Sequence, residues 1–256
     1  REMSIILTPF IPCSAKLPII ALFAGAFFKD YEWVVTLSLY LFAIAIILIS
    51  AIVISRVFVK NKSNTVLIEL PEYKLPSIKY VLRDAGEKTI SFIKRAGTVI
   101  LLCSFIVWFL GSFTISFNYI DGVNYHTKNS ILAGIGNLFA WVFYPMLGEI
   151  SWAAAVSAVQ GLVAKELVVS SMEVIAGLEE GAGVVLFDSH LFSFFNPASA
   201  YAFMVFNLFS APCFGAIGAM KKEFGSAKKM WIAIGFQTGI AYVLACLVFG
   251  IGSLLI

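Results

Sequence analysis

Charged residues are scarce in this sequence. Asp, Glu, Lys and Arg together make up 13% of the 256 residues, whereas 60% are apolar and 15% are aromatic. A soluble domain carries about 25% charged residues, and a water-soluble fold of this size cannot bury so many Phe, Ile and Leu side chains. The low charge therefore excludes an ordinary soluble domain. It predicts an all-α integral membrane protein that crosses the bilayer several times.

Signatures of common enzyme and metal-binding classes are also missing. The sequence has no GxxxxGK[ST] phosphate loop, no Ser-His-Asp set and no paired catalytic carboxylates. Its four cysteines form no CxxC motif, and its two histidines, His126 and His190, stand alone in polar loops, so no zinc-like spacing occurs. We therefore expect no enzymatic activity and no resident cofactor in this chain.

A secretory signal peptide is absent as well. The chain begins at Arg1 and runs directly into Ile5-Ile6-Leu7, without the n-region and small-residue cleavage site that such a signal needs. We expect the sequence to be one part of a larger protein.

Long apolar stretches dominate what is present. A helix needs about 20 residues to cross the hydrocarbon core of a membrane, and three uncharged stretches reach that length: residues 33 to 55, 97 to 117 and 230 to 256. Five further stretches are apolar but short, charged or broken by proline: residues 4 to 15, 16 to 28, 131 to 147, 151 to 176 and 199 to 220. The sequence predicts a polytopic helix bundle.

The basic residues gather in two places. Lys and Arg are frequent in residues 60 to 95 and 221 to 229, whereas residues 118 to 130 and 177 to 198 hold only Lys128 between them. The positive-inside rule therefore predicts that the two basic loops are cytoplasmic. Anionic lipid accounts for these charges, so we expect no nucleic-acid partner. The charges fit both a double crossing and a re-entrant hairpin between residues 131 and 176.

Two apolar segments, near opposite ends of the chain, are interrupted by a Pro-Cys pair. The first is PFIPCSAKLP, with Pro12 and Cys13, and the second is SAPCFGAIG, with Pro212 and Cys213. Proline breaks a helix, and the freed backbone carbonyls are tolerated only inside the protein or along a cavity. Paired interruptions of this kind indicate a transport site, and a thiol beside free carbonyls suits a transition metal. The alternative is two proline kinks, each with an incidental cysteine.

A second candidate site is the Lys165-Glu166 pair inside an apolar stretch. A charge at the bilayer centre costs at least about 2.5 kcal/mol, so such residues usually face a cavity. Glu166 suits cation binding or proton relay, and Lys165 suits bonding the carbonyls of a broken helix. A structural ion pair is the alternative for both. Asn207, five residues before the second Pro-Cys pair, offers an amide oxygen, although structural hydrogen bonding is the simpler role.

Four stretches resemble the bacterial ferrous iron transport protein B (FeoB) family. They are PFIPCSAKLP, LPEYKLPSIKYVLRDAGEKTISFIKRAGTVIL, GLVAKELVVSS and MVFNLFSAPCFGAIGAMKKEFGSAKKMW, and they follow in the family's order over essentially the whole chain. On this resemblance residues 1 to 59 hold the first gate segment and a spanning helix. Residues 60 to 95 form a cytoplasmic linker with an amphipathic helix. Residues 96 to 256 hold the remaining membrane helices and the second gate segment.

The resemblance implies transport of ferrous iron across the bacterial cytoplasmic membrane. Cys13, Cys213 and Glu166 would contact the metal, and Pro12, Pro212, Lys165 and Asn207 would shape the gate or the ion path. The family also has an N-terminal GTPase domain, which would bring GTP and Mg2+ and is not in these residues. The other implied partners are the lipid bilayer, small cytoplasmic accessory proteins and further copies of the chain. One departure is Lys16, where the family pattern leads us to expect Arg.

Two other functions fit the same fold. Proteins with similar gate-type repeats handle nucleosides or other small solutes, in which case Asn207, Gln237 and Glu166 would bind the solute and the cysteines would be incidental. Replacing Cys213 would then leave transport intact. A non-transporting membrane scaffold is the third possibility, and it predicts that neutralising Glu166 changes no flux.

Overall fold

The computed structural model describes residues 2–58, 77–114, 130–161, 165, 167–176, 178, 183–189 and 191–255. Glu166, His126 and His190 lie outside these residues. The described chain is helical, with Thr114 and Ser130 forming an isolated antiparallel bridge. Its helices are α1 (Glu2–Leu7), η1 (Thr8–Phe10), η2 (Ser14–Lys16), α2 (Leu17–Phe27), α3 (Glu32–Phe58), α4 (Ile78–Ser112), α5 (Ile131–Leu147), α6 (Trp152–Gln160), α7 (Leu167–Ile175), η3 (Gly183–Asp188), α8 (Pro197–Phe209), α9 (Phe214–Phe224) and α10 (Ala227–Leu255).

The predicted membrane bundle is confirmed. By length and composition, four described helical segments can cross a membrane: Ser4–Phe27, Glu32–Arg56, Pro197–Phe224 and Ala227–Leu254. Two of these contain the predicted interruptions, so each is a broken span made of shorter helices. The chain is therefore an all-α polytopic membrane protein.

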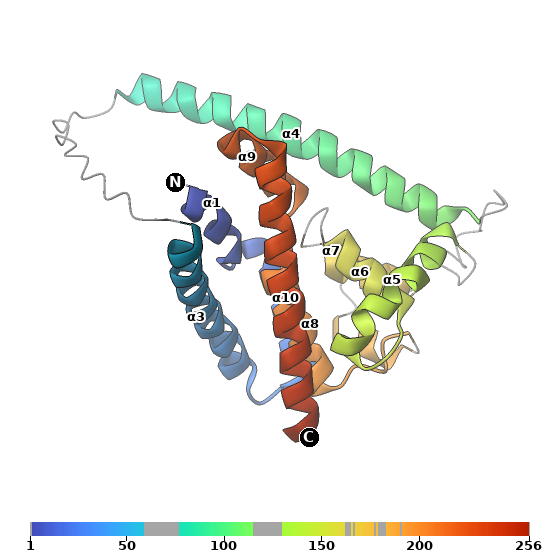
Figure 1. Ribbon diagram of the computed structural model, residues 1–256. Coiled ribbons are helices and arrows are strands. Elements are labelled where there is room, and N and C mark those ends of the chain that lie inside the picture. The colour runs from blue at the N-terminus through green and yellow to red at the C-terminus, as the bar shows by residue number, and fades with distance from the viewer. Residues whose placement is uncertain are drawn as a thin grey trace.

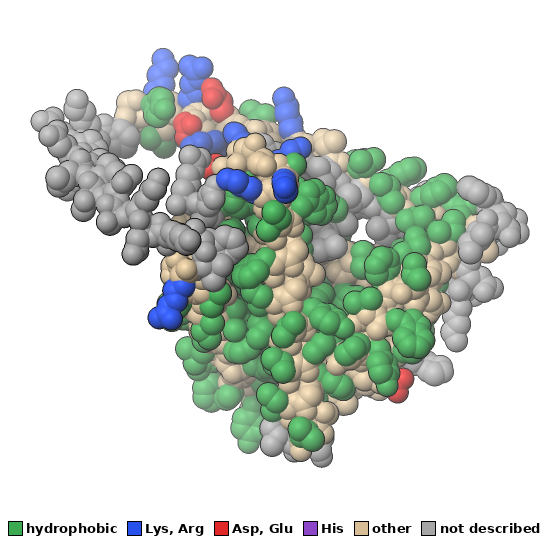
Figure 2. Space-filling model, in the orientation of Figure 1, with side chains coloured by type: hydrophobic (Ala, Val, Ile, Leu, Met, Phe, Trp, Pro, Cys, Tyr) green, Lys and Arg blue, Asp and Glu red, His purple; other side chains and the backbone are tan. Residues whose placement is uncertain are grey.

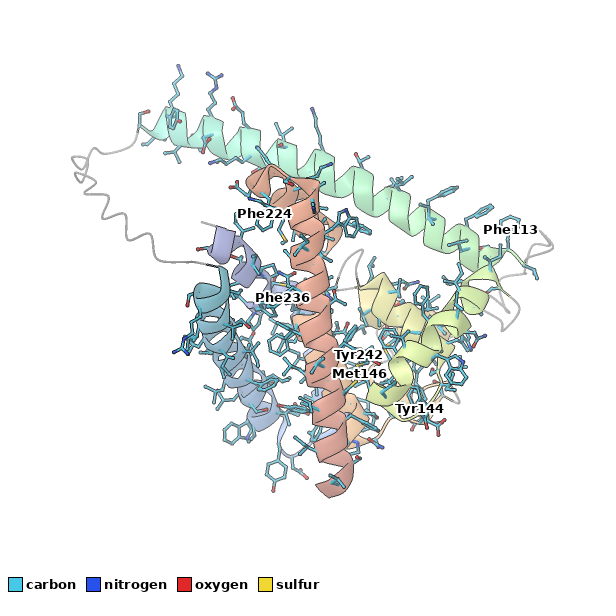
Figure 3. The ribbon with its side chains drawn as sticks, viewed as in Figure 1. Phe113, Tyr144, Met146, Phe224, Phe236 and Tyr242 are labelled. Carbon is cyan, nitrogen blue, oxygen red and sulfur yellow. The ribbon has the colours of Figure 1, made fainter. Side chains whose placement is uncertain are left out.

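The helices pack around α10 and α8. In Figure 1, α10 runs through the middle of the molecule with α8 beside it, α3 lies on one flank, and α5, α6 and α7 lie on the other. The core at these contacts is apolar: Phe143 of α5 meets Phe206 of α8 with ring centroids 5.3 Å apart. Met146 of α5 and Tyr242 of α10 lie where those two helices meet (Figure 3).

Helix α4 joins two parts of the sequence that we expected to be separate. The amphipathic part of the linker and the apolar stretch from residue 97 form one continuous helix, which lies across the end of the bundle near α9 (Figure 1). Its charged half carries the exposed pairs Arg83–Glu87 and Asp84–Lys88, and the bond to Asp84 raises the pKa of Lys88. That residues 97 to 117 cross the membrane by themselves stays a prediction.

Lys and Arg side chains concentrate at this same end. Figure 2 shows them over α4 and α9, while hydrophobic side chains cover the flanks of the bundle below. This separation of charge from apolar surface follows the pattern that the positive-inside rule predicts for a cytoplasmic face.

The path of the chain between residues 131 and 176 differs from two straight crossings. Helix α5 contains Pro145 and ends at Gly148 in a left-handed conformation with a φ of 78°. Helix α6 then leaves at an angle of 95° to α5, and α6 and α7 are only 9 residues each. Neither α5 nor α6 alone reaches the roughly 20 residues needed to span the core, and by length and composition α5 and α6 together fit either one bent span or a re-entrant loop.

Candidate functional site

Both predicted helix breaks are present in the structure. In the first broken span the chain passes from η1 through an extended stretch, including Pro12, into η2 and α2. In the second, α8 ends at Phe209, and the chain is extended through Pro212 before α9 begins. The prolines therefore lie inside the breaks, as the sequence predicted.

The two broken spans run in opposite directions. Helix α2 leads to the end of the bundle where α3 begins, whereas α8 starts at that end and leads to α9 beneath α4 (Figure 1). The breaks meet in the interior, where the rings of Phe10 and Phe209 lie 6.0 Å apart. Antiparallel broken helices that meet at their breaks are the arrangement of inverted-repeat transporters.

Cys13 and Cys213 occupy equivalent positions. Each is the residue that precedes a helix, Cys13 before η2 and Cys213 before α9, and each has an extended backbone with ψ values of 162° and 161°. Neither side chain caps its helix, and both thiols are free. The repeated backbone geometry presents two sulfur atoms in the same way from two antiparallel spans.

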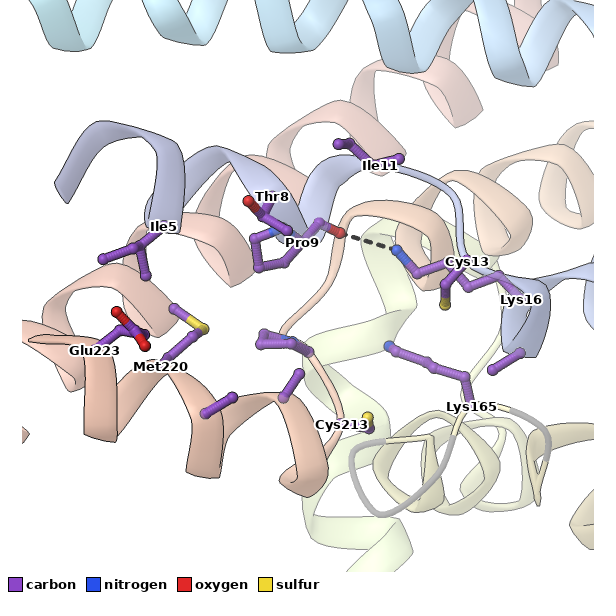
Figure 4. A pocket seen from close by; sticks show the side chains of 14 residues that line it. Ile5, Thr8, Pro9, Ile11, Cys13, Lys16, Lys165, Cys213, Met220 and Glu223 are labelled. Atoms are coloured by element: carbon purple, nitrogen blue, oxygen red, sulfur yellow. Dashed lines mark hydrogen bonds between the residues drawn. The ribbon is translucent and has the colours of Figure 1, made fainter. Parts of the chain in front are cut away.

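A cavity of about 370 Å³ lies between the two spans. Figure 4 shows Cys13 and Cys213 on facing walls of this cavity, with the side chain of Lys165 between them. The full lining is Ile5, Thr8, Pro9, Ile11, Cys13, Ala15, Lys16, Lys165, Pro212, Cys213, Ala216, Ala219, Met220 and Glu223. The structure therefore brings together both cysteines, Lys165 and Pro212 of the predicted site.

Lys16 holds the two spans together. Its side chain is only 5% exposed, and its ammonium donates to the carbonyl of Pro9 at 3.0 Å and to that of Leu208 at 2.7 Å. Pro9 belongs to the first span and Leu208 to the last turn of α8. From the sequence we noted Lys16 only because the family pattern has Arg at this position. Its charge inside an apolar stretch is the feature that could have indicated a buried hydrogen-bond partner.

Lys165 is buried in the same cavity. Its side chain is 2% exposed, and its ammonium donates to the hydroxyl of Ser210 at 2.6 Å (Figure 4 shows its position). Ser210 directly follows α8 as its C-cap residue. We expected Lys165 to bond carbonyls of a broken helix, and it reaches the end of that helix through a hydroxyl.

The two candidate amides lie apart from the thiols. Asn207 donates to the carbonyl of Phe203 in its own helix at 3.0 Å, and Gln237 of α10 donates to the carbonyl of Ile6 at 2.8 Å. Neither lines the cavity that holds the cysteines. Each amide nitrogen therefore bonds a helix backbone, whereas Oδ1 of Asn207 and Oε1 of Gln237 are buried without a hydrogen-bond partner among the described residues.

Two acidic residues emerge that we did not single out. Glu223 of α9 lines the cavity at the end far from the cysteines, beside the thioether of Met220 (Figure 4). Glu173 of α7 is buried and accepts a hydrogen bond from the backbone of Gly183 at 3.2 Å. Glu173 thus ties α7 to η3, whereas Glu223 places negative charge along the cavity.

The donor set seen so far is incomplete for a tightly bound metal. Among the described residues, no three His, Cys, Asp or Glu side chains cluster closely enough to hold an ion. Two thiols with nearby carbonyls and one distant carboxylate suit an ion that passes through, because transit requires binding that is weak enough to release. Glu166, the sequence neighbour of Lys165, lies outside the described residues.

Comparison with known proteins gives consistent matches. A family model named Gate and described as nucleoside recognition matches residues 93–227, and a model described as ferrous iron transport protein B C terminus matches residues 36–88. Proteins named Fe(2+) transporter FeoB match the whole chain with 36% identity in Staphylococcus aureus (strain COL) and in Methanocaldococcus jannaschii. The protein of that name in Escherichia coli K12 is 26% identical over 99% of the chain.

The matches cover only part of each relative. The chain spans 37% of the length of the S. aureus protein and 38% of the other two. No solved structure matches the chain significantly.

Proposed function

Because the chain belongs to the ferrous iron transport protein B family, we propose that it forms the ferrous ion pathway of a transporter in the bacterial cytoplasmic membrane. The observation that carries this proposal is the pair of thiols from Cys13 and Cys213, which face one cavity from two antiparallel broken spans. Ferrous iron accepts thiolate ligands. In this proposal the ion loses part of its hydration shell as it passes between the two sulfur atoms.

The cavity's lining supports a cytoplasmic opening. Its walls extend along α9 through Met220 to Glu223, toward the end of the bundle that carries the Lys and Arg side chains. At the other end of α2, Phe23 packs edge-on against Phe187 and Phe195 at centroid distances of 5.0 and 5.2 Å. This aromatic packing would close the outer side while the cytoplasmic side is accessible.

Other parts of the mechanism extend the same proposal. Glu166 would supply negative charge near Lys165, and Asn207 would fix the end of α8. In the full-length protein, GTP and Mg2+ bound by an N-terminal domain would bias the gate through the cytoplasmic loops 60–95 and 221–229. Accessory proteins and further copies of the chain would act through the same face.

Nucleoside transport is the second candidate, and the Gate model's description favours it. Its predicted solute ligands, Asn207 and Gln237, do not meet in the cavity, since each donates to a backbone carbonyl elsewhere. The described geometry and the relatives' names therefore favour ferrous iron over nucleosides. A non-transporting scaffold would have no need for facing thiols.

Uptake of radiolabelled ferrous iron tests the proposal. Cells that lack their own ferrous transporter would express the full-length parent protein, either unaltered, with Cys13→Ala and Cys213→Ala together, or with Cys246→Ala as a control from α10. We expect uptake by the unaltered and control proteins and none by the double variant, at matched membrane levels. Equal uptake by all three proteins would show that Cys13 and Cys213 are not needed for iron transport. If the unaltered protein takes up no iron, the assignment of ferrous iron as the transported ion is wrong, and solute transport becomes the favoured function.

A further inference from the structure

The carbonyl groups freed by the two helix breaks already hold a cation. The ammonium of Lys16 bonds the Pro9 carbonyl at 3.0 Å and the Leu208 carbonyl at 2.7 Å, one from each broken span. Freed carbonyls at membrane depth are the groups that coordinate transported cations in broken-helix transporters. An ammonium has three N–H donors and no acceptor, so it satisfies such carbonyls as a metal ion would.

A divalent ion that enters the cavity meets an unfavourable charge. Lys16 and Lys165 are both almost completely buried and both line the cavity that holds the two thiols. Repulsion between like charges is strong where water is excluded. The nearest described carboxylate along the cavity is that of Glu223, at the far end from the cysteines (Figure 4). Displacement of an ammonium would relieve this repulsion on an ion that reaches the thiols.

We propose that the Lys16 ammonium is a tethered cation that occupies the carbonyl groups between the two broken spans and is displaced by the transported ion. This inference rests on the proposed ion transport. Displacement would break both hydrogen bonds at once, and the bond to Leu208 joins the first span to the second. Ion entry and separation of the spans would thus be a single event. Lys16 would set the ion concentration at which the gate opens.

Lys16 is the ammonium suited to this role. It bonds a carbonyl in each of the two spans, whereas the ammonium of Lys165 donates to the hydroxyl of Ser210, directly after α8. A lysine is a compact charge on a flexible stem, so it can swing away from two carbonyls without rearrangement of the backbone.

Equilibrium binding of ferrous iron tests this without relying on transport. The full-length parent protein would be purified under reducing, oxygen-free conditions, and iron binding measured by dialysis for the unaltered protein, Lys16→Met, Lys16→Gln and Lys16→Arg. Lys222→Met, an exposed lysine of α9, is the matched control. Thermal unfolding of each variant shows which are folded.

We expect Lys16→Met to bind ferrous iron roughly tenfold more tightly, which corresponds to about 1.4 kcal/mol. Lys16→Gln should bind more tightly than the unaltered protein as well, because it removes the charge while its amide can still donate to a carbonyl. Lys16→Arg and Lys222→Met should bind as the unaltered protein does. Unchanged or weaker binding by folded Lys16→Met or Lys16→Gln overturns the inference.

A second measurement needs no variant. Reaction of the unaltered protein with an amine-specific reagent, followed by mass spectrometry, reports how accessible each lysine is. Saturating ferrous iron should increase the labelling of Lys16 severalfold and leave Lys222 unchanged; no increase at Lys16 overturns the inference. If the unaltered protein takes up no iron, the proposed function fails. If the unaltered protein takes up iron but iron leaves the labelling of Lys16 unchanged, the proposed function stands and only the role of Lys16 as a tethered cation fails.

Discussion

Ser210 and Lys165 are joined by a buried hydrogen bond of 2.6 Å between the serine hydroxyl and the lysine ammonium. Ser210 directly follows α8, and Lys165 lies between α6 and α7. The bond therefore fastens the bent α5–α6–α7 region to the second broken span. A buried ammonium needs such a partner, because a buried charged donor left without one is costly.

Ser210→Ala should destabilise the protein. It removes the hydroxyl partner of a buried charge, and hydrogen bonds to charged groups contribute about 1.5–3 kcal/mol. Thermal unfolding of the purified full-length protein in detergent measures the loss. Ser253→Ala is the control, because that exposed hydroxyl bonds only Gly250 within its own helix. Equal unfolding temperatures for the two variants would show that Lys165 has other adequate partners.

Gly136→Ala should also be destabilising, for a steric reason. A β-carbon at this position would stand 2.6 Å from Cγ2 of Val156 and 3.0 Å from the carbonyl oxygen of Trp152, where α5 crosses α6. Overpacking of this kind costs about 1–3 kcal/mol. The measurement is the unfolding temperature of the membrane-extracted protein.

Gly134→Ala is the matched control for that substitution. It lies on the same helix, and an added β-carbon there meets no atom within 4 Å. Alanine favours a helix by about 0.8–1.0 kcal/mol over glycine, so this variant should be neutral or slightly more stable. A loss of stability as large as that of Gly136→Ala would contradict the close α5–α6 packing.

The helix breaks were the most predictable part of the site. Proline removes a backbone donor and disfavours the helix interior, so Pro12 and Pro212 each marked a position where a break was expected. The charge pattern likewise predicted which end of the bundle carries Lys and Arg, and Figure 2 shows those side chains gathered over α4 and α9. Such features are local, and a single segment of sequence carries them.

The partners across the cavity were not predictable in this way. Lys16 bonds the carbonyl of Leu208, which is 192 residues away, and neither segment of sequence indicates which cation meets a carbonyl freed in the other. The continuity of α4 was missed because the linker's change from charged to apolar looks like a boundary, although helix propensity runs through it. Glu223 was overlooked because it stands in a lysine-rich segment, where a carboxylate is unremarkable.

Glu223→Gln should weaken iron uptake at low iron concentration. The carboxylate lies along the cavity on the basic side of the bundle, where it attracts cations. Its loss should raise the apparent KM for ferrous iron and leave the maximal rate unchanged, because charge near an opening acts mainly on encounter. Uptake into vesicles over a range of iron concentrations measures both quantities. Glu149→Gln, an exposed carboxylate outside the cavity lining, should change neither.

The cysteines should react from one side of the membrane. Three full-length proteins, each retaining Cys13, Cys213 or Cys246 as its only cysteine, would be exposed to a membrane-impermeant maleimide in intact cells and in inverted vesicles. Cys13 and Cys213 line a cavity that extends along α9 toward the basic end of the bundle. Labelling of both should therefore be faster in inverted vesicles.

Two comparisons decide what that labelling means. Ferrous iron should slow the reaction of Cys13 and Cys213, because a bound ion occupies the sulfur atoms. It should not affect Cys246, which lies on α10 outside the cavity lining. Faster labelling in intact cells would instead place the opening on the outer side. The proposed direction of access would then be wrong. The ring of Phe23 would have to move away from those of Phe187 and Phe195 in the membrane to open the outer side.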